Sequence, residues 1–323
     1  GRFDGVYGVL SGLEVIRTLN DLGYETEHPI EAAVWTNEEG SRFAPAMVSS
    51  GVFAGVYDLE YGLSRADEDG KTMGEELERI GYAGPDEVGG RDVHAFFEVH
   101  IEQGPILEEE DITIGVVTDA QGQRWYELTL TGVESHAGPT PMERRKDALL
   151  GAARVVELVN KTGHDNAPVA CATVGMMNVY PNSRNVIPGQ VFLTIDIRHP
   201  NDDVLTGMDA AIRDGIAKIA SDIGLESDLT QIFYYAPVSF DEGCVDSVRR
   251  GTEDCGYSAR DIVAGAGHVA CYMAQVAPTS MVFVPCVDGI SHNEVEDAKP
   301  EWITAGCDVL LRAMLDKAGH HSQ

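Results

Sequence analysis

The chain has 323 residues, 43% of them hydrophobic, so it is long enough for two domains that each bury a core. Its 53 acidic and 23 basic residues give a net charge of −30, which excludes nucleic acid as a favoured partner because phosphates are bound through lysine and arginine. No apolar run approaches the roughly 18 residues of a membrane span, and no signal-like segment opens the chain.

The acidic excess is the most unusual feature of the composition. Only six of the 23 basic residues are lysine. Such a surface repels itself in dilute buffer, and salt screens that repulsion. We therefore expect a host with a salty cytoplasm, with an acidic surface selected for solubility as the alternative. The six cysteines form no C-x-x-C pair, which predicts buried thiols in a reducing cytoplasm and no thiolate zinc site.

The first part of the chain alternates between predicted helices and strands. A glycine-rich opening runs into apolar residues at helical spacing, and Gly23 ends this predicted helix. Short apolar runs predict strands over 30–40, 94–104 and 112–120, and glycines bound a predicted helix over 70–81. This alternation is typical of an α/β layer with a mostly parallel sheet.

The middle of the chain has a different pattern. Residues 123–135 alternate between apolar and polar, as in a half-exposed strand, and residues 169–200 read as two or more strands. Predicted helices cover 144–163 and 202–224, the second with Asp202 or Asp203 near its cap. The pattern predicts a small α+β sheet with two helices on one face.

The α/β pattern then resumes, with a strand and polar loop over 280–296 and a closing helix over 301–319. The sequence thus predicts one α/β domain, residues 1–118 and 234–323, interrupted by an insert of residues 119–233.

Acidic and imidazole side chains recur at the predicted strand ends and loops. Asp4 follows the glycine-rich opening, Glu38 and Glu39 end one strand, His100 ends another, and His292 follows the last. Ligands of open α/β sheets bind beyond the carboxyl ends of strands, so we expect these groups to converge. Histidine and carboxylate without thiolate suit a catalytic Zn, Mn, Co or Ni site. Each residue alone also fits a packed histidine, a turn former or a solvated strand end.

Seven segments carry a resemblance to a known family. They are, in chain order, GRFDGVYGVLSGLEV, TNEEGSRF, HIEQGPILE, SHAGPTPMERRKDAL, NSRNVIPG, DIRHP and GISHNEVE. Together they resemble the hydantoinase/carbamoylase branch of the M20 metallopeptidase-like amidohydrolases, which includes N-carbamoyl-L-amino acid hydrolases, allantoate amidohydrolases and β-ureidopropionases. The resemblance implies an α/β/α metallohydrolase domain, with the insert as a lid and dimerisation domain.

The resemblance also implies two divalent metal ions, Zn or Mn, Co or Ni. By that resemblance Asp4 bridges the ions, Glu39 and His292 bind one of them, and His100 binds the other. Glu38 is the general base that takes a proton from the attacking water.

Further roles follow from the same resemblance. His136 matches the lid histidine that polarises the substrate carbonyl. Asn185 and Arg198 match a pair that binds a carboxylate, although a strand-end ion pair explains Arg198 equally well. Gln103 matches a contact to the ureido group, and Gly289 belongs to the same substrate-binding set.

Two departures from the family pattern bear on activity. The family's H-x-D motif lies upstream of the bridging aspartate, and nothing precedes Gly1 here, so the α/β domain is expected to be N-terminally incomplete. We therefore expect the His100 ion to lack a ligand and this chain to bind one ion weakly or none, with little turnover. Val269 follows His268 where the family has aspartate.

The sequence-level hypothesis is a cytoplasmic hydrolase for the carbamoyl C–N bond of N-carbamoyl-L-amino acids, small molecules that carry a ureido and a carboxylate group. Allantoate amidohydrolase and β-ureidopropionase are close alternatives, and an M20 aminopeptidase or aminoacylase is a distant one. A non-catalytic binding protein is the alternative from another class. We expect a homodimer formed through the lid, in which some lid residues act in trans, and no nucleic acid or membrane partner.

Overall fold

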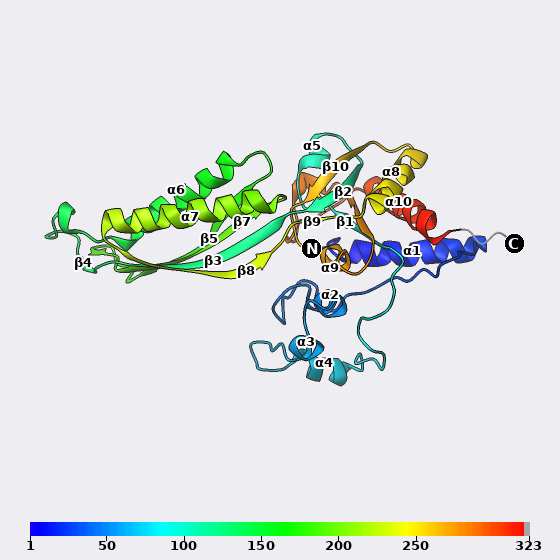
Figure 1. Ribbon diagram of the computed structural model, residues 1–323, viewed down its shortest axis with the longest axis horizontal. Coiled ribbons are helices and arrows are strands. Elements are labelled where there is room, and N and C mark those ends of the chain that lie inside the picture. Colours follow the sequence, from blue (N-terminus) through cyan, green and yellow to red (C-terminus); the bar gives the residue numbers. More distant parts are fainter. Residues whose placement is uncertain (320–323) are drawn as a thin grey trace. The chain divides into compact units, whose positions relative to one another are not determined.

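The computed structural model describes residues 1–319, and its contacts divide the chain into two compact units. Unit 1 comprises Gly1–Ala120 and Ser239–Gln323, and unit 2 comprises Gln121–Val238. The borders lie a few residues later than the expected 118 and 233. Each unit has its own sheet (Figure 1).

The sheet of unit 1 is mixed. Its strands are β1 (Phe96–Ile101), β2 (Ile114–Ala120), β10 (Ala259–Ala264) and β11 (Thr279–Val284), in the order β1-β11-β2-β10, and the short β9 (Val238–Ser239) pairs with β2. β1 runs parallel to β11 and β2 parallel to β10, whereas β11 and β2 are antiparallel. Every residue of β11 is buried, as in a central strand covered on both faces. The predicted α/β class is confirmed.

Helices cover both faces of this sheet. α1 (Val6–Leu22), α8 (Glu242–Cys255) and α10 (Pro300–Ala318) pack together on one face, where Gly306 of α10 approaches Val99 and Val284. α9 (Val269–Met273) packs against β1 and β11 from the other face. Because strand side chains alternate, β1 turns Val99 toward α10 and His100 toward α9.

A helical segment follows the first loop of unit 1. It contains α2 (Val48–Phe53), α3 (Leu59–Leu63) and α4 (Met73–Ile80). The helix predicted over 70–81 is α4, which begins with a capping box between Thr72 and Glu75 and ends at Gly81. The helix predicted to end at Gly23 is α1, and Gly23 adopts the left-handed conformation that ends it.

The strand predicted over residues 30–40 is wrong. Residues 29–35 have no regular secondary structure and pair with no strand in the described part of the chain, and Val34 is 72% exposed. Trp35 instead packs edge-on against Phe53 and Phe96. A short run of apolar residues favours a strand, but a strand also needs a neighbouring strand to satisfy its backbone hydrogen bonds.

Unit 2 is a four-stranded antiparallel sheet with two helices on one face (Figure 1). Its strands are β3 (Gly122–Thr131), β5 (Cys171–Tyr180), β7 (Gln190–His199) and β8 (Glu226–Tyr235), in the order β5-β7-β3-β8. The helices α6 (Ala148–Asp165) and α7 (Asp202–Ile223) share one apolar core with β3 and β7. The predicted α+β insert is therefore present, although β8 was not anticipated.

One helix starts later than the sequence predicts, whereas the other starts at Asp202 as expected. α6 begins at Ala148, because Asp147 accepts hydrogen bonds from Leu149 N and Leu150 N and so caps it there. α7 is capped by Asn201, which accepts a hydrogen bond from Val204 N, while Asp202 and Asp203 occupy its first turn. Negative side chains in the first turn are stabilised by the positive, N-terminal end of the helix dipole.

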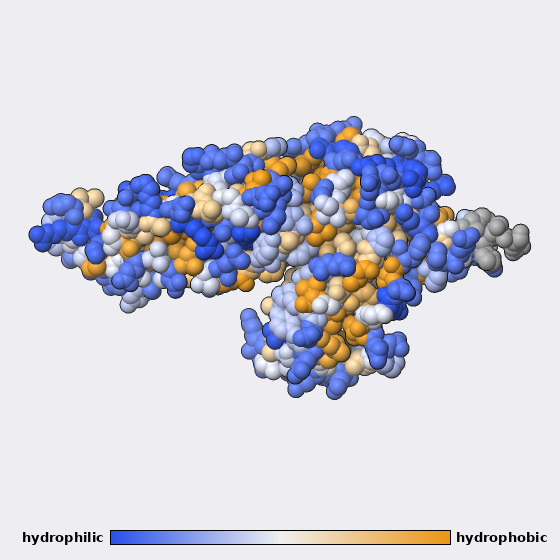
Figure 2. All heavy atoms as spheres, viewed as in Figure 1, coloured by the Kyte–Doolittle hydropathy of each residue, from blue (hydrophilic) through white to orange (hydrophobic). Residues whose placement is uncertain are grey.

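The face of the molecule shown in Figure 2 is largely hydrophilic, with scattered apolar patches. Within residues 1–319, no helix combines the length and the apolar character that crossing a bilayer requires. Cys244, Cys271 and Cys286 are buried as expected, whereas Cys171 is exposed at the start of β5, on the sheet face opposite the helices.

Candidate active site

Asp4 lies at the centre of a cluster assembled from four separate segments of unit 1. Its carboxylate is 7% exposed and has a histidine at each oxygen: Oδ1 lies 3.0 Å from His100 Nε2, and Oδ2 lies 3.1 Å from His292 Nε2. Glu39 Oε1 lies 3.5 Å from the same His292 nitrogen. The structure thus brings together the four side chains that the sequence singled out as metal ligands.

The donor set fits a divalent cation. Asp4, Glu39 and His292 each offer one ligand atom, all within 4.8 Å of one another, and this is the one such group of three in the described part of the chain. Two carboxylates and an imidazole without thiolate suit Zn or Mn, Co or Ni.

His100 gives a second reason to place a positive charge at Asp4. Its Nδ1 lies 2.9 Å from Ile101 O, so both ring nitrogens face oxygen acceptors. A neutral imidazole donates through one nitrogen only. The arrangement therefore calls for a protonated ring or for a cation between His100 and Asp4.

Electrostatics keep Asp4 ionised. Burial raises the pKa of the Asp4 carboxyl, but hydrogen bonds from His100 and Ser291, together with the charges of His100 and His292, outweigh it and lower that pKa well below its usual range. An ionised carboxylate is the form that binds metal.

Glu38 lies in the same electrostatic environment. Burial and the charges of Glu98 and Glu39 raise the pKa of Glu38 to about 7. A carboxylate with a pKa near neutrality exchanges protons readily, which is the property a general base requires.

Two side chains near His100, the half-buried Glu98 and the buried His268, were missed or left open by sequence reasoning. Glu98 accepts a hydrogen bond from Ala270 N (2.8 Å), and burial raises its pKa. Its place two residues before His100, on the same face of β1, is the signal that could have revealed it. His268 packs edge-on against His100, with ring centroids 4.6 Å apart, and burial lowers its pKa, so it is neutral.

Two neighbouring residues, Glu102 and Gln103, follow β1 and make different contacts. Glu102, for which no role was predicted, accepts hydrogen bonds from Ile106 N and Leu107 N at the start of α5 (Ile106–Glu109). Gln103 turns into the site and donates from Nε2 to Asp4 Oδ2 (2.9 Å). Gln103 has a φ of 59° and His292 a φ of 54°, a region that non-glycine residues occupy at a cost, and such strain often accompanies function.

Gly289 has a steric explanation in the structure. Its φ is +65°, and a Cβ at this position would lie 2.6 Å from Pro105 N. Only glycine therefore permits the loop before His292 to approach the turn that follows Gln103. A substrate contact of Gly289 stays a prediction.

The predicted lid residues lie in unit 2, where two of them are neighbours. His136 belongs to β4 (Ser135–His136), which pairs with β6 (Val186–Ile187), and Ala137 N donates to Asn185 O (2.8 Å). His136 is exposed, and its Nδ1 accepts a hydrogen bond from Gly138 N.

Arg198 lies at the other end of the unit 2 sheet. β7 begins at Gln190, close after β6, and Arg198 is eight residues farther along, a separation of roughly 26 Å at the usual strand rise. Arg198 pairs with Asp196 at 2.7 Å, the ion pair considered from the sequence. Within one chain, Asn185 and Arg198 therefore cannot bind the same carboxylate.

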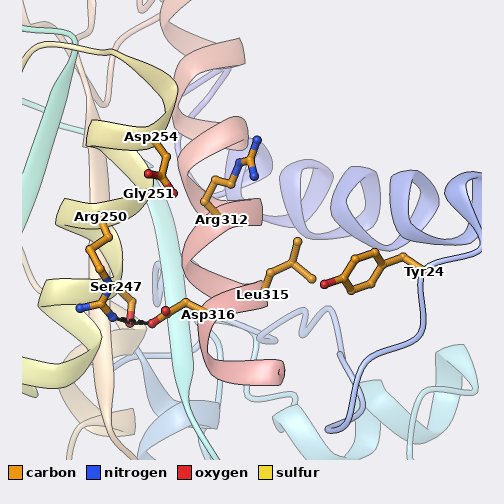
Figure 3. Close-up of a pocket in the computed structure, with 8 residues that line it drawn as sticks. All are labelled: Tyr24, Ser247, Arg250, Gly251, Asp254, Arg312, Leu315 and Asp316. Atoms are coloured by element: carbon orange, nitrogen blue, oxygen red, sulfur yellow. Dashed lines mark hydrogen bonds and ion pairs between the residues drawn. The ribbon is translucent and has the colours of Figure 1, made fainter. Parts of the chain in front are cut away.

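A separate pocket of about 290 Å³ lies in unit 1 beside α8 and α10 (Figure 3). Its lining residues are Tyr24, Ser247, Arg250, Gly251, Asp254, Arg312, Leu315 and Asp316. Asp316 accepts hydrogen bonds from Arg250 and Ser247, both at 2.6 Å. None of the candidate ligands lines this pocket, and two of its charged groups, Arg250 and Asp316, neutralise each other.

Comparison with known proteins shows the family to which the chain belongs. The profile of peptidase family M20/M25/M40 matches residues 1–316. The chain belongs to this family. Among M20 relatives, an N-carbamoyl-L-amino-acid amidohydrolase of Rhizobium meliloti is 54% identical over 318 residues, which are 98% of this chain and 76% of that protein. An allantoate amidohydrolase of Bacillus subtilis (strain 168) is 32% identical over 318 residues, with the same shares covered.

A solved structure extends the likeness to three dimensions. The crystal structure of an amidase of the hydantoinase/carbamoylase family from Burkholderia multivorans matches with a TM-score of 0.95 and 75% identity, covering 98% of this chain and 77% of that one. The family membership inferred from the seven sequence segments is confirmed.

Proposed function

We propose that the chain is a metal-dependent amidohydrolase that cleaves the carbamoyl C–N bond of N-carbamoyl-L-amino acids. The observation that carries the proposal is the ionised Asp4 carboxylate held between His100 and His292, with Glu38 in the same electrostatic environment. The name of the 54% identical relative supports the substrate class.

Asp4, Glu39 and His292 would hold one divalent ion, and Asp4 with His100 would contribute ligands to a second. When bound, such an ion acts as a Lewis acid and lowers the pKa of water.

The residues of the chain supply the rest of the chemistry. Glu38 takes a proton from the attacking water as the new C–O bond forms, and returns it to the leaving nitrogen as the C–N bond breaks. The products are the amino acid and carbamic acid, which decomposes to CO₂ and ammonia. His136 stabilises the developing charge on the carbonyl oxygen.

Recognition of the substrate's two ends requires different donors. Arg198 and Asn185 bind its carboxylate, Arg198 through its planar fork. Gln103, beside Asp4, and Gly289 contact its ureido group, for which an amide side chain can both donate and accept.

The separation of Arg198 from His136 and Asn185 supports a homodimer built through unit 2. In such a homodimer one copy would supply its His136 and Asn185 in trans to the Glu38 and metal ligands of the other copy, so that Asn185 and Arg198 need not come from the same chain. Co-expression of His136→Ala with Glu38→Gln tests this arrangement. Heterodimers would contain one intact site, so activity should return to roughly a quarter of the wild-type value; no recovery would mean that His136 acts in cis.

The substrate assignment is tested by ammonia release from three compounds in the presence of Zn, Mn or Co. We expect the highest kcat/KM with N-carbamoyl-L-amino acids. A preference for allantoate, the substrate named for the Bacillus relative, or for 3-ureidopropionate would replace the assignment within the same chemistry. Substrate binding without turnover under every metal would support a non-catalytic binding protein only if a longer form of the chain that carries the H-x-D segment also fails to turn the substrate over.

A further inference from the structure

A fully buried carboxylate lies behind the candidate metal ligands. Glu296 is 0% exposed and belongs to the loop that carries His292. Its Oε1 accepts hydrogen bonds from Phe3 N (2.7 Å) and Asp4 N (3.1 Å), and its Oε2 accepts one from Ser291 Oγ (2.9 Å). One side chain therefore joins the segment of Asp4 to the segment of His292.

Ser291 extends this connection to the ligand itself. Its Oγ also lies 3.1 Å from Asp4 Oδ2, the oxygen that faces His292, and 3.3 Å from Gln103 Nε2. The hydroxyl is thus shared between the carboxylates of Glu296 and Asp4.

The other local hydrogen bonds of these segments stay within each segment: Val6 N donates to Asp4 O (2.8 Å), and Glu296 N donates to Asn293 O (3.1 Å). They do not join one segment to the other. Asp4 precedes α1, whose cap position is a glycine without a side-chain hydrogen bond. His292 lies in a loop and has a strained φ of 54°. Hydrogen bonds from backbone amides to an ionised, buried carboxylate are among the strong ones in proteins.

We propose that Glu296 is a positioning residue of the metal centre, which holds Asp4 and His292 at the separation that a shared divalent ion requires. This inference rests on the proposed function. Residues that hydrogen-bond to metal-bearing segments orient the ligands, and their replacement typically weakens metal binding 10- to 100-fold. A merely structural carboxylate would affect the free energy of unfolding but not the metal affinity of the folded protein.

The test is a Co²⁺ titration of the folded protein, in which binding is measured by calorimetry and by the visible absorption of the bound ion. Glu296→Gln keeps the shape of the side chain and an oxygen for the two amides but removes the charge. We expect its Kd for Co²⁺ to rise about 10- to 100-fold, with an altered absorption spectrum. Ser291→Ala leaves Glu296 in place and removes the shared hydroxyl, and we expect a smaller rise in Kd of several-fold.

Asp147→Asn is the matched control. Asp147 also accepts two backbone amides, from Leu149 and Leu150, but it caps α6 in unit 2. The same chemical change there should lower the melting temperature and leave the Kd and spectrum of Co²⁺ unchanged.

The outcomes separate the inference from the function on which it rests. A wild-type Kd and spectrum in Glu296→Gln, with only a lower melting temperature, would overturn the positioning role while leaving the metal site intact. If Glu296→Gln does not fold, Ser291→Ala decides by the same criteria. Absence of Co²⁺ binding by the wild-type chain would overturn the metal site and the inference together.

Discussion

Replacing Gly289 by alanine tests the loop geometry beside the candidate site, and Gly256→Ala is its matched control. Both glycines have positive φ, +65° and +75°, so both variants place a Cβ in the left-handed region. That conformation costs an alanine about 1 kcal/mol. Gly256 has nothing within 4 Å of the added Cβ, whereas at Gly289 the Cβ would lie 2.6 Å from Pro105 N, in backbone that cannot move aside freely.

The extra backbone shift in Gly289→Ala should cost about 2 kcal/mol more than the control. Unit 1 is of a size at which each kcal/mol lowers the melting temperature by about 3 °C. We therefore expect a loss of about 3 °C for Gly256→Ala and about 9 °C for Gly289→Ala by calorimetry. Because Gly289 adjoins the turn that bears Gln103, its variant should also raise KM. Equal thermal losses in the two variants would refute the close approach of the two loops.

Three further predictions follow from the charges and contacts of the two units. Glu38→Gln should lower kcat about 10²- to 10⁴-fold while leaving the Kd for Co²⁺ within about 3-fold, as measured by ammonia release and calorimetry; an unchanged kcat would remove Glu38 as the base. Arg198→Lys should raise KM about 10-fold or more with kcat less affected, because lysine cannot form the bidentate pair with a carboxylate; an equal fall in kcat and kcat/KM would assign Arg198 to the transition state instead. Raising NaCl from 0.1 to 1 M shortens the screening length from about 10 to about 3 Å, so the melting temperature should rise for a chain of net charge −30; a fall would contradict the role given to self-repulsion.

Much of the fold was predictable because local signals and tertiary structure agree. Short stretches of sequence predict three of these features: the glycine that ends α1, the capping box of α4 and the alternation of apolar and polar residues along β3. The failed strand over residues 30–40 shows the limit, since its apolar pattern is genuine but no strand within residues 1–319 pairs with it. β8 was missed because its outward side chains are mostly polar and its periodicity is interrupted by a bulge.

The candidate metal ligands could be predicted from the sequence, but the residues that hydrogen-bond to them could not. Asp4 and His292 belong to sequence segments that resemble a family, so they could be named. Glu296 and Ser291 form hydrogen bonds with residues almost 300 positions away in the sequence, and no local sequence pattern predicts such contacts. The distance between His136 and Arg198 likewise depends on the length of β7, and that length can be used only when the strand pairing is known.

The most direct test of the central claim is anomalous X-ray diffraction from crystals of this chain grown with Co²⁺, measured at the cobalt absorption edge. We expect an anomalous peak bounded by Asp4, Glu39 and His292. A peak at other residues, or none at these three at saturating Co²⁺, would contradict it.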